Sequence, residues 1–226
     1  MNELKLFQKD IRSYQIVSTV LDKLCGFCAV NLYNYLVNLD TFEKIKNKYG
    51  DCGSWAIWAQ SGDKPKSNIG DLTVLDPSIN KKLLSQLKPE YVFVGLNFSS
   101  IDELVPFANF HSPSPKAQDF KIRFALRNTD YWGSYMTDII KNFEEKKSNK
   151  MMDVLNEDKN LENRNIEIFL EEIESLGVPN KKIIAFGGDT YKILERNLKD
   201  KYNLVKVTHY SHFISKENYR YELAKI

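Results

Sequence analysis

The chain has 226 residues, of which 42% are hydrophobic, and carries a formal net charge of +2. This composition fits one substantial globular domain and excludes a chain that is disordered throughout. No uncharged apolar stretch reaches the roughly 18 residues that a membrane-spanning helix needs, and the charged start MNELKLFQKD does not fit a signal peptide. We therefore expect a cytoplasmic protein with no membrane partner.

The first part of the chain predicts helices. Apolar residues recur at helical spacing over residues 4–48, and we assign residues 1–60 to an N-terminal helical extension. Cys25 and Cys28 form a CxxC motif, and Cys52 follows later, so a redox pair or a metal site is one interpretation. We favour small core residues instead, because no second CxxC and no nearby histidine completes a zinc set. We expect no metal and no other cofactor.

Beyond a loop at residues 61–71, predicted strands alternate with predicted helices. The expected strands are Tyr91–Leu96, Tyr135–Ile140, Ile183–Phe186 and Leu204–Val207, and the expected helices are Pro77–Leu87, Gln118–Arg127, Glu162–Leu176 and Asp189–Leu198. Residues 99–119 predict a loop or a covering flap, and the charge-dense residues 144–163 predict a mobile insert. The alternation indicates an α/β fold, a three-layer sandwich around a central, mostly parallel four-stranded sheet, in a single domain of residues 1–226.

Polar side chains follow or interrupt three of these strands. Asn97 and Phe98 end the first strand, Asp138 lies within the second, and His209 and His212 follow the last. Because the carboxyl ends of parallel strands meet at one edge of a sheet, we expect these side chains to share a pocket. A carboxamide, a carboxylate, an aromatic ring and two imidazoles suit bond cleavage at a sugar's anomeric carbon, where a water is held, a leaving anion is stabilised and a flat ring is stacked.

Four segments together resemble the uracil-DNA glycosylase superfamily, particularly its mismatch-specific and thermophilic branches. They lie within a core of residues 90–215 and are GLNFSS at 95–100, YMTDIIK at 135–141, KIIAFGGDTYKIL at 182–194 and THYSHFIS at 208–215. Their order and spacing carry the resemblance, because each motif is short. The resemblance implies a DNA glycosylase that releases a damaged or mismatched base from DNA by cleaving the N-glycosidic bond.

The resemblance also implies a role for each motif residue. Asn97 would position the hydrolytic water and His209 would stabilise the leaving base. The remaining assignments are base-binding roles for Phe98, Asp138 and His212, and DNA contacts for Ser99, Lys141, Lys206 and Ser211. Two mildly basic segments, residues 116–150 and 181–226, flank the acidic residues 151–180, which permits a phosphate-facing surface.

Three positions depart from the pattern of the superfamily. Phe98 and Tyr210 stand where prolines are expected, and Asp138 stands where an asparagine usually reads the pyrimidine edge. An ionised carboxylate only accepts hydrogen bonds, so Asp138 favours a base that presents an amino or N–H donor and would bind uracil only when protonated. These departures leave two alternatives open, a non-catalytic nucleic-acid or nucleotide-binding protein with this fold, and a hydrolase or transferase that acts on a free nucleoside or nucleotide.

Structural roles remain the alternative for individual residues. Asn97 could cap a helix that begins at Ser99, and Phe98 could be part of the core. The histidines at 111, 209 and 212 could be hydrogen-bonded structural residues, and the Gly187-Gly188 turn could serve tight chain reversal as well as phosphate binding.

Overall fold

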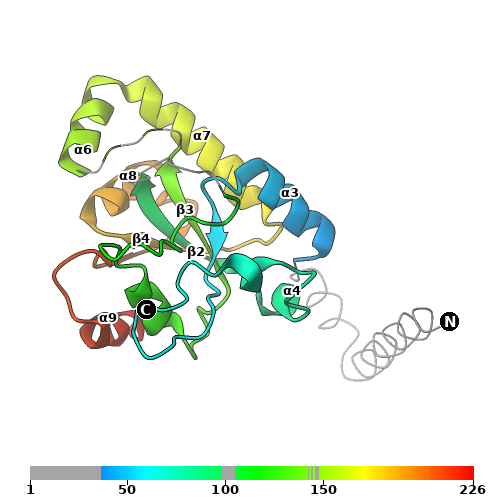
Figure 1. Ribbon diagram of the computed structural model, residues 1–226. Helices are drawn as coiled ribbons and strands as arrows, with labels where there is room; N and C mark the ends of the chain where they lie inside the picture. The colour runs from blue at the N-terminus through cyan, green and yellow to red at the C-terminus, as the bar shows by residue number, and fades with distance from the viewer. Residues whose placement is uncertain (1–36, 98–104, 142, 144, 146–147) are drawn as a thin grey trace. The chain divides into compact units, whose positions relative to one another are not determined.

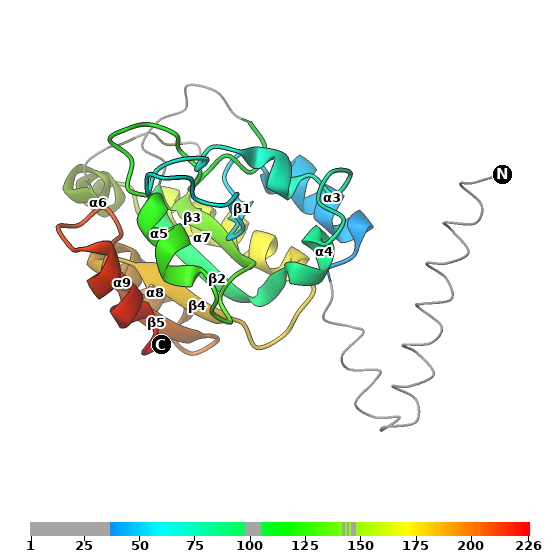
Figure 2. The same cartoon turned by 60° about the horizontal axis from the view of Figure 1, so that its bottom comes forward.

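The computed structural model describes residues 37–97, 105–141, 143, 145 and 148–226. Its centre is a five-stranded sheet with the strand order β1-β3-β2-β4-β5 (Figures 1 and 2). The strands are β1 (Ser54–Trp55), β2 (Lys88–Asn97), β3 (Ser134–Ile140), β4 (Lys182–Phe186) and β5 (Asn203–Val207). All neighbours pair in parallel except β1, which runs antiparallel to β3 at the edge. The α/β class and the mostly parallel sheet are confirmed.

The prediction of four strands was wrong, because β1 adds a fifth. This strand pairs Ser54 with Met136 and Trp55 with Tyr135, so part of the segment assigned to a helical extension belongs to the sheet. A strand of two residues gives no periodic pattern in the sequence, and only its partner strand defines it. Residues 1–36, with Cys25 and Cys28, lie outside the described part of the chain.

Helices cover both faces of the sheet. One face carries α3 (Leu39–Tyr49), α6 (Ser148–Glu157), α7 (Lys159–Ser175) and α8 (Gly188–Leu198), and the other carries α5 (Phe120–Leu126) and α9 (Lys216–Leu223). Figure 2 shows α5 and α9 side by side at the same face. Short turns of helix, η1 (Leu72–Leu75) and α4 (Leu83–Gln86), precede β2. Among the described residues, no helix is both long and apolar enough to cross a membrane.

The strand residues alternate between two hydrophobic cores. Val92 and Val94 of β2 pack with α3, α7 and α8, whereas Phe93 packs with α5 and α9. On β3, Tyr135 packs in the same core as Val92 and Val94, and Met136 packs in the same core as Phe93. Both faces of the central strands are therefore buried, which is why the sequence of β2 is an almost continuous apolar run.

Capping side chains precede α3, α7 and α9. Asn38 accepts a hydrogen bond from the Thr41 backbone N–H at 2.9 Å ahead of α3, and Asp158 accepts one from Leu161 at 3.0 Å ahead of α7. The helix expected at Pro77–Leu87 is limited to the four residues of α4. The segment expected as a mobile insert, residues 144–163, contains α6 and the first turn of α7, and buries Met151 and Leu155 in the core.

Candidate functional site

The carboxyl ends of the four parallel strands open into a cleft of about 1950 Å³, which we call the strand-end cleft. Its walls include Asn97 of β2, Asp138 of β3, the Phe186–Gly188 turn after β4, and His209 after β5. Residues 108–119 form a further wall. Asn97, Asp138, His209 and His212 therefore line one cleft, because the parallel strands end at the same edge of the sheet.

Asp138 is buried at the base of this cleft. The residue is 4% exposed, and its Oδ2 accepts a hydrogen bond from Asn109 Nδ2 at 2.8 Å. Gly95 lies opposite on β2, where an added Cβ would stand 2.1 Å from Asp138 Oδ1, so only glycine leaves room for the carboxylate. Burial raises the Asp138 pKa to about 6, although the Asn109 hydrogen bond and the Lys141 charge lower it. This carboxyl group therefore titrates close to neutral pH.

Asn109 holds Asp138 in place and was missed at the sequence level. Its amide nitrogen donates both to Asp138 and to the Cys52 carbonyl at 2.8 Å, while its own oxygen accepts from the Phe110 backbone N–H at 3.1 Å. Phe107 and Phe110 have positive φ angles of 65° and 64°, so the loop around Asn109 is sharply folded. Such non-glycine residues give no turn signal, which left Asn109 in an undifferentiated loop.

Asn97 lies at the last position of β2 and lines the cleft. Its amide nitrogen donates to the backbone carbonyls of Phe143 at 3.2 Å and Glu145 at 2.8 Å. These bonds tie the chain after β3 to the end of β2, so Asn97 has a structural task beside the water-positioning role expected of it. Phe98 and Ser99 lie outside the described residues, as does any helix that Asn97 could cap.

His209 presents a neutral ring to the cleft. Its Nδ1 accepts the Ser211 backbone N–H at 3.2 Å and lies 2.7 Å from the Ser211 hydroxyl oxygen. Because Nδ1 is an acceptor here, the neutral imidazole carries its proton on Nε2. Burial, and secondarily the His212 charge, lowers the His209 pKa to about 4. The ring is therefore an uncharged Nε2–H donor at neutral pH, stacked on Tyr210 with 4.4 Å between centroids.

The glycine turn after β4 makes space for this histidine. Gly187 has a φ of 89°, and an added Cβ would come 3.3 Å from the Cβ of His209. Phe186 contacts both His209 and Tyr210 edge-on, at 6.3 and 5.3 Å between centroids, and it also approaches Phe110 at 6.0 Å. An aromatic cluster of Phe110, Phe186 and Tyr210 thus packs beside His209 in the wall of the cleft.

The remaining residues of the last motif lie at the rim of the cleft. His212 and Ser211 are exposed, and Lys206 is exposed on β5 with its Nζ 5.9 Å from the centre of the Tyr191 ring. Phe213, which the sequence did not single out, is fully exposed at 103%. A large aromatic side chain that is exposed to solvent beside a cleft suggests contact with a partner. The sequence signal that could have identified Phe213 is its place inside the motif THYSHFIS at 208–215.

Lys141 is the clearest correction. Assigned to contact DNA, it is buried and forms an ion pair with Glu172 of α7, with Nζ 2.5 Å from Oε2. Its Nζ also donates to Thr137 at 2.6 Å, and Tyr135 donates to Glu172 at 2.8 Å. A backbone phosphate cannot reach this ammonium group, so the assignment was wrong. Sequence position alone did not show that the end of β3 lies under a helix.

Two other titratable groups line the cleft and support its walls. Asp119 is buried, accepts a hydrogen bond from the Ser112 backbone N–H at 2.8 Å, and has its pKa raised to about 6 by burial. His111 is buried with Nε2 3.3 Å from the Trp55 carbonyl oxygen, and burial lowers its pKa to about 3. His111 is therefore neutral and packed, the structural role considered for it.

The charge of the cleft walls is mixed and leans acidic. Lys116 and Lys206 are the lysines of the described lining, and the carboxylates are Asp51, Asp119, Asp138, Glu145, Asp189 and Glu222. Some of these are engaged, since Asp189 pairs with Lys192 and Glu222 accepts from the Thr208 backbone N–H. No group of three or more metal-ligating side chains occurs in the part of the chain that the structure describes. The cleft is thus equipped for hydrogen bonding and stacking more than for neutralising phosphates.

No protein-family model matches the chain, and neither a curated protein nor a solved structure shows significant similarity to it.

Proposed function

We propose that this protein hydrolyses the N-glycosidic bond of a base held in the strand-end cleft, and that the base belongs to DNA. The observation that carries the proposal is the presence of Asp138 and the neutral Nε2–H donor of His209 in one cleft at the ends of parallel strands. The four motifs that resemble the uracil-DNA glycosylase superfamily add to it. Helices on both faces of the sheet also fit the three-layer sandwich of that superfamily, which we propose for this chain.

In this mechanism the base leaves as an anion. A water held by Asn97 forms a bond to the anomeric carbon while the bond from that carbon to the base nitrogen breaks with its electron pair. His209 donates a hydrogen bond from Nε2 to the departing base, which develops negative charge in the transition state. Because the imidazolium pKa of His209 is lowered to about 4, the ring is neutral at pH 7, and its Nε2–H stabilises the anion by hydrogen bonding alone. The water's second proton passes to solvent.

Asp138 would select the base. With a pKa of about 6, its carboxyl group is mostly ionised at pH 7 and accepts a hydrogen bond from an amino or ring N–H group. Below about pH 6 the protonated form can donate to a carbonyl such as that of uracil. The proposal therefore expects preference for bases with an N–H donor at neutral pH, and growing uracil release as the pH falls.

Phe213 would act on duplex DNA as an apolar wedge. A base inside a duplex has to leave the stack before it can enter a cleft, and inserted apolar side chains lower the cost of that step. The complete exposure of Phe213 at the rim supports this role. Phe213→Ala should slow release from duplex DNA by about tenfold or more, and release from single strands less.

A second candidate function is hydrolysis of a free nucleoside. The acidic walls of the cleft favour it, because a neutral nucleoside is not repelled by Asp51, Asp189 or Glu145 as a DNA strand is. The two candidates use the same reaction and differ in substrate. Under this alternative, Phe213→Ala leaves activity unchanged, and base release does not fall steeply with salt.

The test is a base-release assay on duplex and single-stranded oligonucleotides with uracil, hypoxanthine, xanthine or mismatched bases, beside the matching nucleosides. Asn97→Ala and His209→Ala should each abolish release and keep the native circular dichroism spectrum, and Lys199→Ala, an exposed residue of α8's carboxyl end, should keep full activity. Release that persists in both cleft variants would refute the mechanism. Retained DNA or nucleotide binding without release from any substrate would instead support a non-catalytic binding protein.

A further inference from the structure

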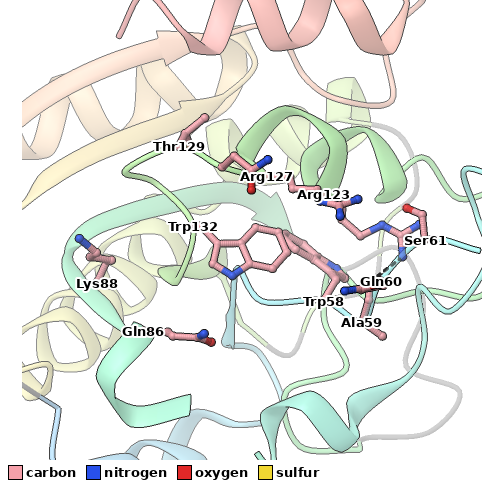
Figure 3. Close-up of a pocket in the computed structure, with 11 residues that line it drawn as sticks. Trp58, Ala59, Gln60, Ser61, Gln86, Lys88, Arg123, Arg127, Thr129 and Trp132 are labelled. Carbon is pink, nitrogen blue, oxygen red and sulfur yellow. Dashed lines mark hydrogen bonds between the residues drawn. The ribbon is translucent and has the colours of Figure 1, made fainter. Parts of the chain in front are cut away.

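A second cavity, of about 450 Å³, lies at the opposite end of the sheet and shares no lining residue with the strand-end cleft. Lys88 is the first residue of β2, Trp132 precedes β3, and Arg127 follows the last residue of α5. We call this cavity the indole pocket, after Trp58 and Trp132 (Figure 3). Its size lies within the range of small-molecule sites.

The walls of the indole pocket are fixed by backbone hydrogen bonds. The buried Arg123 guanidinium donates to the carbonyls of Ala59 at 3.3 Å, Ser67 at 2.9 Å and Pro65, which pins the segment that follows Trp58. Gly133, next to Trp132, donates to Ala56 at 3.0 Å and accepts from the Lys88 N–H at 2.8 Å. A cavity built on such constrained backbone is preorganised for a ligand.

The two indoles give the pocket an aromatic surface. Their ring centroids are 5.6 Å apart with an angle of 57° between planes. Trp58 is buried, and its Nε1 donates to the Phe110 carbonyl at 3.2 Å. Trp132 is only partly buried, and Figure 3 shows its indole in the middle of the pocket, with Arg127 on one side and Gln86 on the other. A partly exposed indole in a rigid pocket is a stacking surface for a flat ring.

All ionisable residues of the described lining are cations. Arg123 is committed to backbone carbonyls, whereas Lys88 and Arg127 form no ion pair within the described part of the chain. Arg127 lies close enough that its charge, after the larger effect of burial, lowers the Arg123 pKa. The described lining therefore carries positive charge without a carboxylate, which favours a bound anion.

We propose that the indole pocket binds a mononucleotide, with its base stacked on Trp132 and its phosphate held by Arg127 and Lys88. The indole requires a flat ring, the cations require an anion, and the neighbouring amides of Gln60 and Gln86 offer hydrogen bonds to a polar ring edge. The proposal concerns a site at the other end of the sheet from the cleft, so it does not depend on base release.

Fluorine NMR of the full chain labelled with fluorotryptophan gives a readout at the site, because the chain has only three tryptophans. Titration with AMP or UMP should shift the Trp132 signal, which Trp132→Leu identifies by its loss. Adenosine lacks the phosphate, and ribose phosphate lacks the aromatic ring. Each should therefore bind at least about tenfold more weakly than AMP. Arg127→Gln should weaken AMP binding by about tenfold, whereas Lys199→Gln, a matched exposed cation, should not.

Three results would overturn the proposal. The first is a Trp132 signal that millimolar AMP and UMP leave unmoved. The second is an affinity for AMP that is the same in Arg127→Gln as in the wild type, or an affinity for adenosine as high as that for AMP. The third is loss of the nucleotide-induced shift in His209→Ala, which would place the nucleotide in the strand-end cleft. Retained shift in His209→Ala supports the indole pocket, whatever the base-release assay gives.

Discussion

Replacing Asp138 by asparagine should stabilise the protein at neutral pH. Asp138 is 4% exposed, and burial raises the pKa of its carboxyl group from 3.8 to about 6. Since one pKa unit corresponds to about 1.4 kcal/mol, ionised Asp138 costs the native state about 3 kcal/mol. Asparagine has nearly the same shape, carries no charge, and can accept the same hydrogen bond from Asn109. A stabilising change at a cleft residue would mark a site where stability is given up for function.

The raised pKa of Asp138 fixes the direction in which its effect on stability changes with pH. A group whose pKa is higher in the native state binds protons preferentially there, so its favourable contribution is complete below about pH 3.8 and is lost as the pH rises through about 6. Asp138→Asn removes that titration. The stability of the variant relative to the wild type should therefore rise by about 2 kcal/mol between about pH 4.5 and about pH 7.5, which is the larger part of the full effect of about 3 kcal/mol.

Urea denaturation of both proteins at these two pH values measures the effect as a difference in the free energy of unfolding. Asp119, whose pKa is also raised to about 6, is present in both proteins, so the subtraction removes its own titration. Asp63→Asn is the control, because it lies exposed in a loop and should change stability by less than about 0.5 kcal/mol. A difference between Asp138→Asn and wild type that is the same at both pH values would refute the reasoning.

Three further predictions rest on the same structure. Lys141→Met should lower the free energy of unfolding by about 3–5 kcal/mol, because it leaves the buried Glu172 carboxylate without its ion-pair partner. The double variant Lys141→Met with Glu172→Gln should recover part of that loss in the same denaturation assay. Equal stability of the single and double variants would contradict this prediction. Gly95→Ala should destabilise by about 1–3 kcal/mol through the clash with Asp138, whereas Gly188→Ala, with nothing within 4 Å of its added Cβ, serves as the tolerated control. Cys52, buried and with a pKa raised to about 12 by burial, should react with a thiol reagent only on unfolding, measured in a chain with Cys25→Ser and Cys28→Ser; rapid labelling of the folded protein would show the thiol to be accessible.

The apolar runs of the sequence predicted the four parallel strands and their neighbouring helices well. β2 and β3 are buried on both faces, so their side chains form continuous apolar segments that stand out from the surrounding chain. The convergence of Asn97, Asp138 and His209 on one cleft was also predictable, because parallel strands bring their carboxyl ends to a single edge.

Segments with weak or mixed patterns were predicted poorly. β1 has two residues and is defined by its pairing with β3, and α6 lies in a charged segment whose Met151 and Leu155 become core only against α7. Phe213 is apolar and yet exposed, the reverse of what composition suggests. In each case the decisive contact comes from another part of the chain.

The sequence by itself determined the α/β class, the helix caps such as Asn38 and the positions of the polar strand ends, because all of these depend on neighbours a few residues away. Only the tertiary structure decided what those polar groups can do. Asp138 contacts Asn109, 29 residues away in the chain, and Lys141 contacts Glu172, 31 residues away. As a result, the carboxylate of Asp138 lines a cleft, while the lysine three residues later is buried in the core. Burial and distant partners set the charge and reach of each group, and these are properties of the folded chain.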